Sequence, residues 1–207
     1  EFKWLTRKHG RAALFAATPP SECLRILLSI MTTRGEVVER GVEDQMEMMI
    51  LDVRRAHFYA RALRRMFVEM PKEDPRWAEC HGVAELLMSL YGTQDAAANW
   101  EAEYSQKLEQ WGYAKGKASP CLFHNADEEV KVLVHGDDFV VVGMPKELQW
   151  MQEQLEQKYE LTVELLGPDQ GQKQEVRVLN RILRWTKDGV EYEADPRHAG
   201  IILQQLN

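Results

Sequence analysis

The chain has few cysteines, no long apolar run and no excess of positive charge. Cys23, Cys80 and Cys121 are the three cysteines among 207 residues, and none is spaced for a structural zinc site. Their odd number fits a reducing, intracellular compartment, and each is expected to be a small buried apolar residue. No apolar stretch approaches the roughly 18 residues that a membrane helix needs, so no membrane partner is expected. Because the sequence begins at Glu1 rather than methionine, we expect an internal piece of a longer protein.

The net charge of −7 does not favour a nucleic-acid-binding surface, since such surfaces are usually basic. The charge is unevenly distributed, however. Residues 54–65 contain five arginines and no acid: Arg54, Arg55, Arg61, Arg64 and Arg65. This cluster predicts either a local basic surface or, more commonly, the solvated face of a helix.

Apolar periodicity predicts an α+β fold. Helices are expected over residues 22–33 with Ser21 as N-cap, from Asp95 to Gly112, and from Pro145 onward. Strands are expected over residues 46–53 and 66–70 and in two hairpins near residues 130–143 and 176–194. Because tight turns join most of the strands, we expect an antiparallel sheet backed by helices on one face. The expected buried helix faces are Ala96, Trp100, Tyr104, Leu108 and Trp111, and Leu148, Met151, Leu155 and Tyr159.

Two adjacent aspartates interrupt the apolar run of residues 130–143, in the tetrapeptide His135-Gly136-Asp137-Asp138. Buried carboxylates are costly unless they are paired or hold a metal ion. The pattern predicts a hairpin that bends at Gly136 and presents the two aspartates at its tip. The alternative is a solvated β-turn, in which aspartate is common.

A third carboxylate, Asp52, ends the predicted strand over residues 46–53. If this strand lies beside the hairpin, Asp52, Asp137 and Asp138 converge. Oxygen ligands of this kind suit hard divalent cations such as Mg²⁺. Two such ions about 3.5–4 Å apart could then bridge the carboxylates, one activating a primer 3′-hydroxyl and the other holding a triphosphate.

An ordered series of short motifs over about residues 12–206 resembles the reverse transcriptase of copia-type LTR retrotransposons. The residues that carry the resemblance are Phe15-Ala16 with Ser21-Glu22-Cys23-Leu24-Arg25-Ile26-Leu27-Leu28, Leu51-Asp52-Val53-Arg54-Arg55-Ala56, Phe67-Val68-Glu69-Met70-Pro71, Ser89-Leu90-Tyr91-Gly92 with Trp100, Ser119-Pro120-Cys121-Leu122-Phe123, and His135-Gly136-Asp137-Asp138, where the family has Y-V-D-D. Each motif is weak alone, but their order and spacing are specific.

The resemblance implies a right-hand polymerase palm with partial fingers, which copies an RNA or DNA template from a primer and deoxynucleoside triphosphates. The implied regions are a fingers segment (residues 1–45), a palm (46–185), and the palm end with the start of a truncated thumb or connection (186–207). Asp52, Asp137 and Asp138 carry over as catalytic residues, and with Val53 as ligands of two Mg²⁺ or Mn²⁺ ions. The implied substrate contacts are Val53, Arg54, Arg55, Ala56, His57, Tyr91 and Gly92.

Departures from the family pattern leave alternatives open. His135 and Gly136 replace an aromatic residue and a valine, and the imidazole could add a titrating group beside the metals. His57 replaces an aromatic residue that normally excludes ribonucleotides, and residues 93–99 lack the family's lysine and arginine. One alternative is therefore a folded relic without catalysis. A weaker alternative is a metal-dependent nucleotide cyclase with a palm-like sheet, although no purine pocket is apparent.

Overall fold

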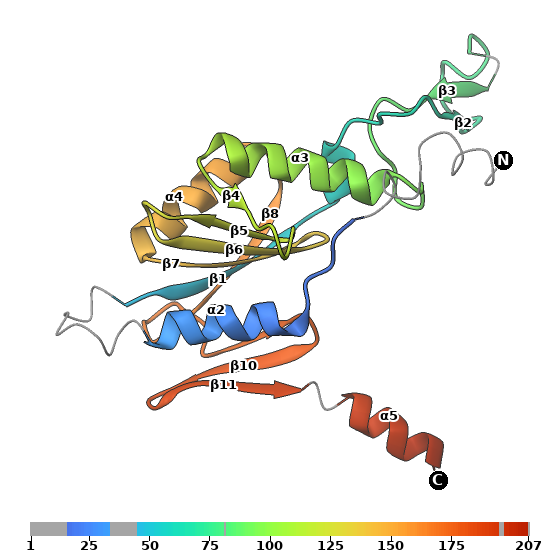
Figure 1. The fold of residues 1–207 in the computed structure, drawn as a ribbon. Coiled ribbons are helices and arrows are strands. Elements are labelled where there is room, and N and C mark those ends of the chain that lie inside the picture. The colour runs from blue at the N-terminus through green and yellow to red at the C-terminus, as the bar shows by residue number, and fades with distance from the viewer. Residues whose placement is uncertain (1–15, 34–44, 81, 195–196, 207) are drawn as a thin grey trace.

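The computed structural model describes residues 16–80, 82–194 and 197–206, except for residues 34–44 (Figure 1). All of the predicted site residues lie within these ranges. Residues 1–15 and 34–44, which belong to the predicted fingers segment, lie outside them. The domain boundaries inferred from the sequence therefore stay predictions.

A six-stranded antiparallel sheet forms the centre of the molecule. Its order is β4-β5-β6-β7-β1-β8. Strand β1 therefore lies between β7, the second strand of the β6–β7 hairpin, and β8. The bounds are Glu47–Val53 for β1, Ala114–Lys115 for β4, Leu122–Asn125 for β5, Val130–His135 for β6, Asp138–Gly143 for β7 and Leu161–Leu166 for β8. The pairing is antiparallel at every junction, as the tight turns in the sequence predict. The assignment of this sheet to a polymerase palm stays a prediction.

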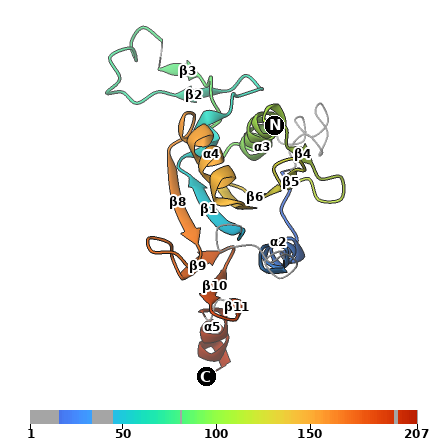
Figure 2. The same ribbon diagram turned by 90° about the vertical axis from the view of Figure 1, so that its left-hand side faces the viewer.

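Helices cover both faces of this sheet, whereas the sequence predicted helices on one face only. Helices α3 (Ala96–Gln110) and α4 (Pro145–Glu156) lie on one face, and α2 (Ser21–Thr33) lies on the other (Figures 1 and 2). The central strands are apolar on both faces, because they must pack against a helix layer on each side. The two cores are clustered around Trp100 and Phe139 on the α3–α4 side and around Leu24 and Met48 on the α2 side.

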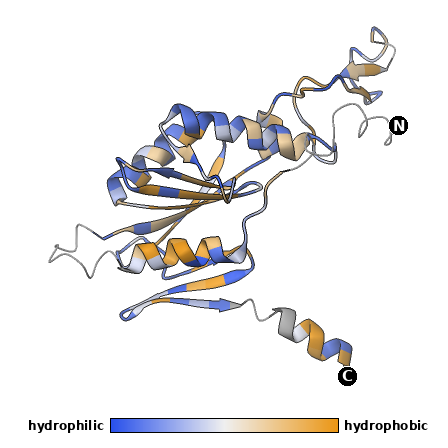
Figure 3. Cartoon of the chain, viewed as in Figure 1, coloured by the Kyte–Doolittle hydropathy of each residue, from blue (hydrophilic) through white to orange (hydrophobic). Residues whose placement is uncertain are grey.

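A second, three-stranded sheet packs against α2 from the side opposite the main sheet (Figure 1). It is formed by β9 (Glu175–Val178), β10 (Arg181–Thr186) and β11 (Gly189–Ala194). Side chains along its strands point alternately to its two faces. The apolar side chains that face α2 and join the α2 core include Val176, Val178 and Leu183. Helix α2 is therefore enclosed between two sheets, which explains why it is one of the most apolar elements in Figure 3.

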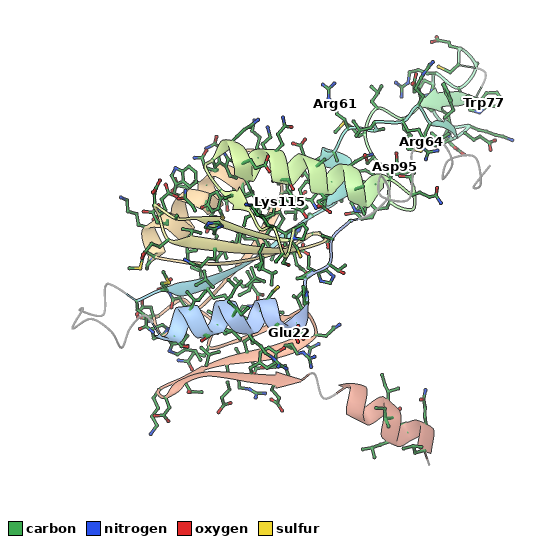
Figure 4. The ribbon with its side chains drawn as sticks, viewed as in Figure 1. Glu22, Arg61, Arg64, Trp77, Asp95 and Lys115 are labelled. Atoms are coloured by element: carbon green, nitrogen blue, oxygen red, sulfur yellow. The ribbon has the colours of Figure 1, made fainter. Side chains whose placement is uncertain are left out.

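Strands β2 (Phe67–Glu69) and β3 (Val83–Glu85) form a separate two-stranded arm that extends away from the main sheet (Figure 1). Its base is held to the start of α3 by an ion pair between Arg64 and Asp95, at 3.4 Å (Figure 4). An isolated pair of strands is marginally stable in water, so this tertiary contact contributes to its position. Phe67 remains 57% exposed on the arm.

The arginine-rich segment differs from the predicted helix face. Only a single 3₁₀ turn, η3 (Ala56–Tyr59), forms there, and the arginines on either side reach different carboxylates. Arg54 and Arg55 pair with Glu160, and Arg65 pairs with Glu85. The cluster is therefore dispersed over two regions and does not form one continuous basic stripe.

Several smaller predictions can also be compared with the structure. Cys23 and Cys121 are buried as expected, but Cys80 is exposed in the loop between β2 and β3, so its prediction was wrong. Ser21 is the first residue of α2, and its hydroxyl donates to the carboxylate of Glu22. Tyr159 is buried but lies just after α4. Helix α5 (Arg197–Leu206) follows β11, and no helix in the described ranges is long and apolar enough to cross a membrane.

Candidate active site

Four polar residues form a row across the main sheet, one on each of four neighbouring strands. His135 on β6 lies opposite Asp138 on β7, Asp138 lies opposite Asp52 on β1, and Asp52 lies opposite Thr162 on β8. Directly opposite residues of antiparallel strands point to the same face of the sheet. The four side chains therefore share one face, and the register confirms that β1 and the hairpin are neighbours.

The pair Asp52–Asp138 is the closer of the two kinds of antiparallel pair. The amide of Val53 donates to the carbonyl of Asp137 at 3.0 Å. The backbone hydrogen bond therefore joins the neighbouring pair Val53–Asp137 and not the pair Asp52–Asp138. In such a non-hydrogen-bonded pair the Cα atoms are typically about 4.5 Å apart and the side chains approach closely. The fold thus holds two carboxylates side by side, and neither forms an ion pair with a cation among the described residues.

The turn that carries Asp137 has two residues, Gly136 and Asp137, between β6 and β7. Gly136 has φ +66°, a conformation that L side chains rarely adopt, although a Cβ there would meet no neighbour within 4 Å. The backbone conformation at position 136 therefore favours glycine, whereas the space around it would admit a larger side chain. The carbonyl of Gly136 accepts a 2.8 Å hydrogen bond from Nε1 of Trp100. This bond fixes the turn to α3, one of the two helices on that face of the sheet.

Burial and mutual repulsion weaken the acidity of two of these carboxyl groups. The pKa of Asp138 is raised by burial, then by the charges of Asp137 and Asp52, while His135 opposes the change. The pKa of Asp52 is raised by burial and by Asp137, while Arg54 opposes the change. Both carboxylates are therefore affected by Asp137, which places the three acids in one electrostatic cluster.

The donor set suits a divalent cation, although the side chains are not gathered into a complete metal cluster. Within the described ranges no group of three or more His, Cys, Asp or Glu side chains is arranged to hold a metal ion. The oxygens available are the carboxylates of Asp52, Asp137 and Asp138. The carbonyl of Val53 is a further oxygen donor. The Val53 amide donates to the carbonyl of Asp137, but the Asp137 amide does not donate to the carbonyl of Val53. Hard oxygen donors with mutually repelling charges fit Mg²⁺ or Mn²⁺.

His57, Phe58 and Tyr91 form an aromatic group, and His57 is within the electrostatic influence of Asp137. His57 stacks on Tyr91 with ring centroids 4.2 Å apart and planes 27° apart, and Phe58 contacts Tyr91 edge-on at 5.5 Å. Burial lowers the pKa of His57, although the charge of Asp137 acts in the opposite direction. The structure therefore brings together His57 and Tyr91, which are 34 positions apart in the sequence, and the charge of Asp137 acts on His57.

The remaining predicted substrate residues adjoin His57 or Tyr91 in the chain. Gly92 follows Tyr91 with φ +89°, and Ala56 is buried at the start of η3. Arg54 and Arg55 both direct their guanidinium groups to Glu160, at 3.0 and 2.6 Å. Their side chains are therefore already paired with an acid that sequence reasoning did not single out.

Trp100, Thr162 and Glu160 are the site neighbours that sequence reasoning missed. Trp100 was predicted as a core residue, and its ring is buried, but its indole N–H also holds the turn. No local signal identifies Thr162 or Glu160, because their positions depend on the pairing of β8 with β1.

Comparison with known proteins gives a partial similarity. No family model matches the chain. Over 121 residues, or 57% of the chain, it is 25% identical to the retrovirus-related Pol polyprotein from transposon TNT 1-94 of Nicotiana tabacum, and the match covers 9% of that polyprotein. Part of the chain is therefore similar to a retrotransposon Pol polyprotein. In structure, 91% of the chain aligns with 43% of apo telomerase from Candida tropicalis truncated from its C-terminal domain, with a TM-score of 0.48 and 10% identity.

Proposed function

We propose that the chain carries the catalytic site of an RNA-directed DNA polymerase of the copia-type retrotransposon class. The observation that carries the proposal is the register that sets Asp52 opposite Asp138 with Asp137 in the adjoining turn. The similarity to a retrotransposon Pol polyprotein supports the same class of protein. The reaction is the transfer of a nucleotide from a deoxynucleoside triphosphate to the 3′-hydroxyl of a primer on an RNA or DNA template.

In this proposal Asp52 and Asp137 are the principal metal ligands, with the carbonyl of Val53, and Asp138 supports them from β7. Two Mg²⁺ or Mn²⁺ ions, when bound, would acidify the primer hydroxyl and neutralise charge on the reacting phosphate. The chain itself holds three carboxylates at fixed positions before substrate arrives. Such preorganisation is the main protein contribution to electrostatic catalysis.

The stacked rings of His57 and Tyr91 form the candidate wall for the sugar of the incoming nucleotide. The stacking of the two rings and the effect of the Asp137 charge on His57 support this role, because the sugar must lie next to the reacting phosphate. The backbone from Val53 to Ala56 lies alongside the proposed triphosphate. The amide of Val53 is bound to Asp137 and that of Arg54 to Glu160. These two amides are therefore assigned to the scaffold and not to the triphosphate.

Primer extension tests the proposal. The chain is incubated with poly(rA)/oligo(dT), thymidine triphosphate and either Mg²⁺ or Mn²⁺, in parallel with Asp137→Asn. Asp127→Asn is the matched control, because Asp127 lies exposed in the turn between β5 and β6 and the charge change is the same. We expect extension by the chain and the control, and a loss of at least about 100-fold in Asp137→Asn, the effect of removing one electrostatic contact to a transition state.

Absence of extension by the unsubstituted chain would overturn the proposal for this chain and favour the non-catalytic relic. Equal extension by the chain and Asp137→Asn would overturn the assignment of the site.

A further inference from the structure

A groove between α2 and β11 lies apart from the carboxylates, on the part of the fold where the three-stranded sheet packs on α2. It encloses about 550 Å³. On α2 its wall includes Arg25, Leu28 and Thr32, which are spaced about one turn apart. On the strand side its wall includes Val190 and Tyr192. The lining therefore mixes apolar and polar side chains, and the groove is cationic at the end where Arg25 lies.

Two guanidinium groups lie over the ring of Tyr192: that of Arg25, which lines the groove, and that of Arg181, which contacts the ring from β10 without lining the groove. The guanidinium carbon of Arg25 lies 5.4 Å from the ring centroid of Tyr192, and that of Arg181 lies 5.8 Å from the same centroid. Both distances are within the range of a cation–π contact. The two arginines come from different elements, α2 and β10, so the fold and not a local turn brings them together.

Neither of these guanidinium groups forms an ion pair with a carboxylate among the described residues. Arg184, on the same strand as Arg181, gives the contrast. It points to the other face of the small sheet and pairs with Glu175 and Glu193. Cation–π contacts do not neutralise charge, so both guanidinium groups keep their positive charge at the Tyr192 ring.

The acid that also lines the groove is too far along the strand to neutralise them. Asp188 precedes Tyr192 by four residues, which corresponds to about 13 Å in an extended chain. The cationic end can therefore accept an anion. Planar guanidinium groups bind phosphate oxygens in a bidentate manner, and the Tyr192 ring holds both groups in place before a ligand arrives.

We propose that Arg25, Arg181 and Tyr192 form a phosphate-binding site at the cationic end of the α2–β11 groove. The ligand is a phosphate group, carried either by a nucleic-acid strand or by a free phosphate compound. The site does not depend on the proposed nucleotidyl transfer, since none of its residues belongs to the carboxylate row.

Side-chain NMR tests the site directly. The arginine Nε–Hε signals of the ¹⁵N-labelled chain are recorded while inorganic phosphate, or an abasic deoxyribose-phosphate oligomer, is added. Arg25→Gln and Arg181→Gln assign the two signals, and Arg184 is the internal reference. We expect the signals of Arg25 and Arg181 to shift and saturate while that of Arg184 stays in place. If neither signal shifts with either compound, the proposal is overturned.

Salt dependence distinguishes the two sources of phosphate. Binding of a labelled single-stranded oligonucleotide is measured at several salt concentrations. Each lost phosphate contact lowers the slope of log K against log salt by roughly 0.7. The double variant Arg25→Gln/Arg181→Gln is expected to lose about 1.4 from the slope if a strand is the ligand, and Arg184→Gln to lose nothing. An unchanged slope together with shifts in inorganic phosphate supports a free phosphate ligand.

Three variants separate this site from other effects. Tyr192→Phe keeps the ring and is expected to keep the response to phosphate, whereas Tyr192→Leu should weaken it. Asp137→Asn should leave the arginine shifts unchanged. Loss of polymerase activity without loss of these shifts would therefore count against the proposed function alone.

Discussion

Asp52 on β1 and Asp138 on β7 lie directly opposite one another, in a pair whose backbones are not joined by a hydrogen bond. Like charges in this position destabilise a sheet. The pKa of each of the two carboxyl groups is raised, which is the expected response to burial and repulsion. The fold therefore tolerates a local loss of stability where the proposed chemistry requires negative charge, a relationship found at many functional sites.

Asp138→Asn should stabilise the chain at pH 7 in the absence of divalent cations. The substitution keeps the size of the side chain and removes one of the repelling charges. The expected gain in the free energy of unfolding is roughly 0.2–1 kcal/mol, the size of a cross-strand charge interaction. Urea denaturation followed by circular dichroism measures the difference.

The pH dependence of this gain has a defined sign. Because the folded-state pKa of Asp138 is raised above 3.8, the folded state binds its proton more tightly than the unfolded state. The unsubstituted chain therefore loses stability as the pH rises from 3.8 through the raised pKa, and Asp138→Asn does not undergo this loss. A variant that is less stable at pH 7 than the unsubstituted chain would contradict the repulsion.

Trp100→Phe should loosen the turn formed by Gly136 and Asp137 without emptying the core. Phenylalanine retains an aromatic ring in the cluster with Tyr104 and Phe139 but cannot donate to the carbonyl of Gly136. The lost hydrogen bond should cost about 0.5–1.5 kcal/mol, and the smaller ring adds to this. Amide hydrogen exchange of residues 135–138 should become faster. Unchanged exchange at the turn with a lower overall stability would show that the indole N–H does not hold it.

His57→Phe should change how stability depends on pH. The folded-state pKa of His57 is lowered below 6.5 by burial, so the unfolded state takes up its proton first as the pH falls. The unsubstituted chain thus loses stability as the pH falls below 6.5, and this part of the loss disappears in His57→Phe. Thermal denaturation between pH 7.5 and 5.5 measures it. Parallel curves for the two proteins would contradict a lowered pKa of the half-buried His57 imidazole.

The sequence contains the local parts of the site but not their pairing. Apolar alternation places Asp52 at the end of one strand, and the glycine turn places Asp137 at a hairpin tip. The conformation of Gly136 and the antiparallel pairing follow from these local patterns. Whether Asp52 lies opposite Asp138 or one residue away depends on register, which only the packed sheet determines.

Longer-range features were not predictable in this way. An apolar α2 fits either one sheet or two, and only the tertiary structure shows that β9–β11 form a second sheet against it. The five arginines looked like one face because spacing in the sequence carries no information on their partners. Glu160, which binds Arg54 and Arg55, lies more than 100 positions away. The role of Trp100 was missed because burial of its ring conceals the function of its N–H group.

The central claim is that Asp52 and Asp137 act as one catalytic unit. A double-mutant cycle in single-turnover primer extension tests it most directly, with Asp52→Asn, Asp137→Asn and the double variant compared with the unsubstituted chain. The effects of residues that act together are not additive, so the double variant should be no slower than the slower single variant. Single losses that multiply in the double variant, or full activity in either single variant, would contradict a shared site.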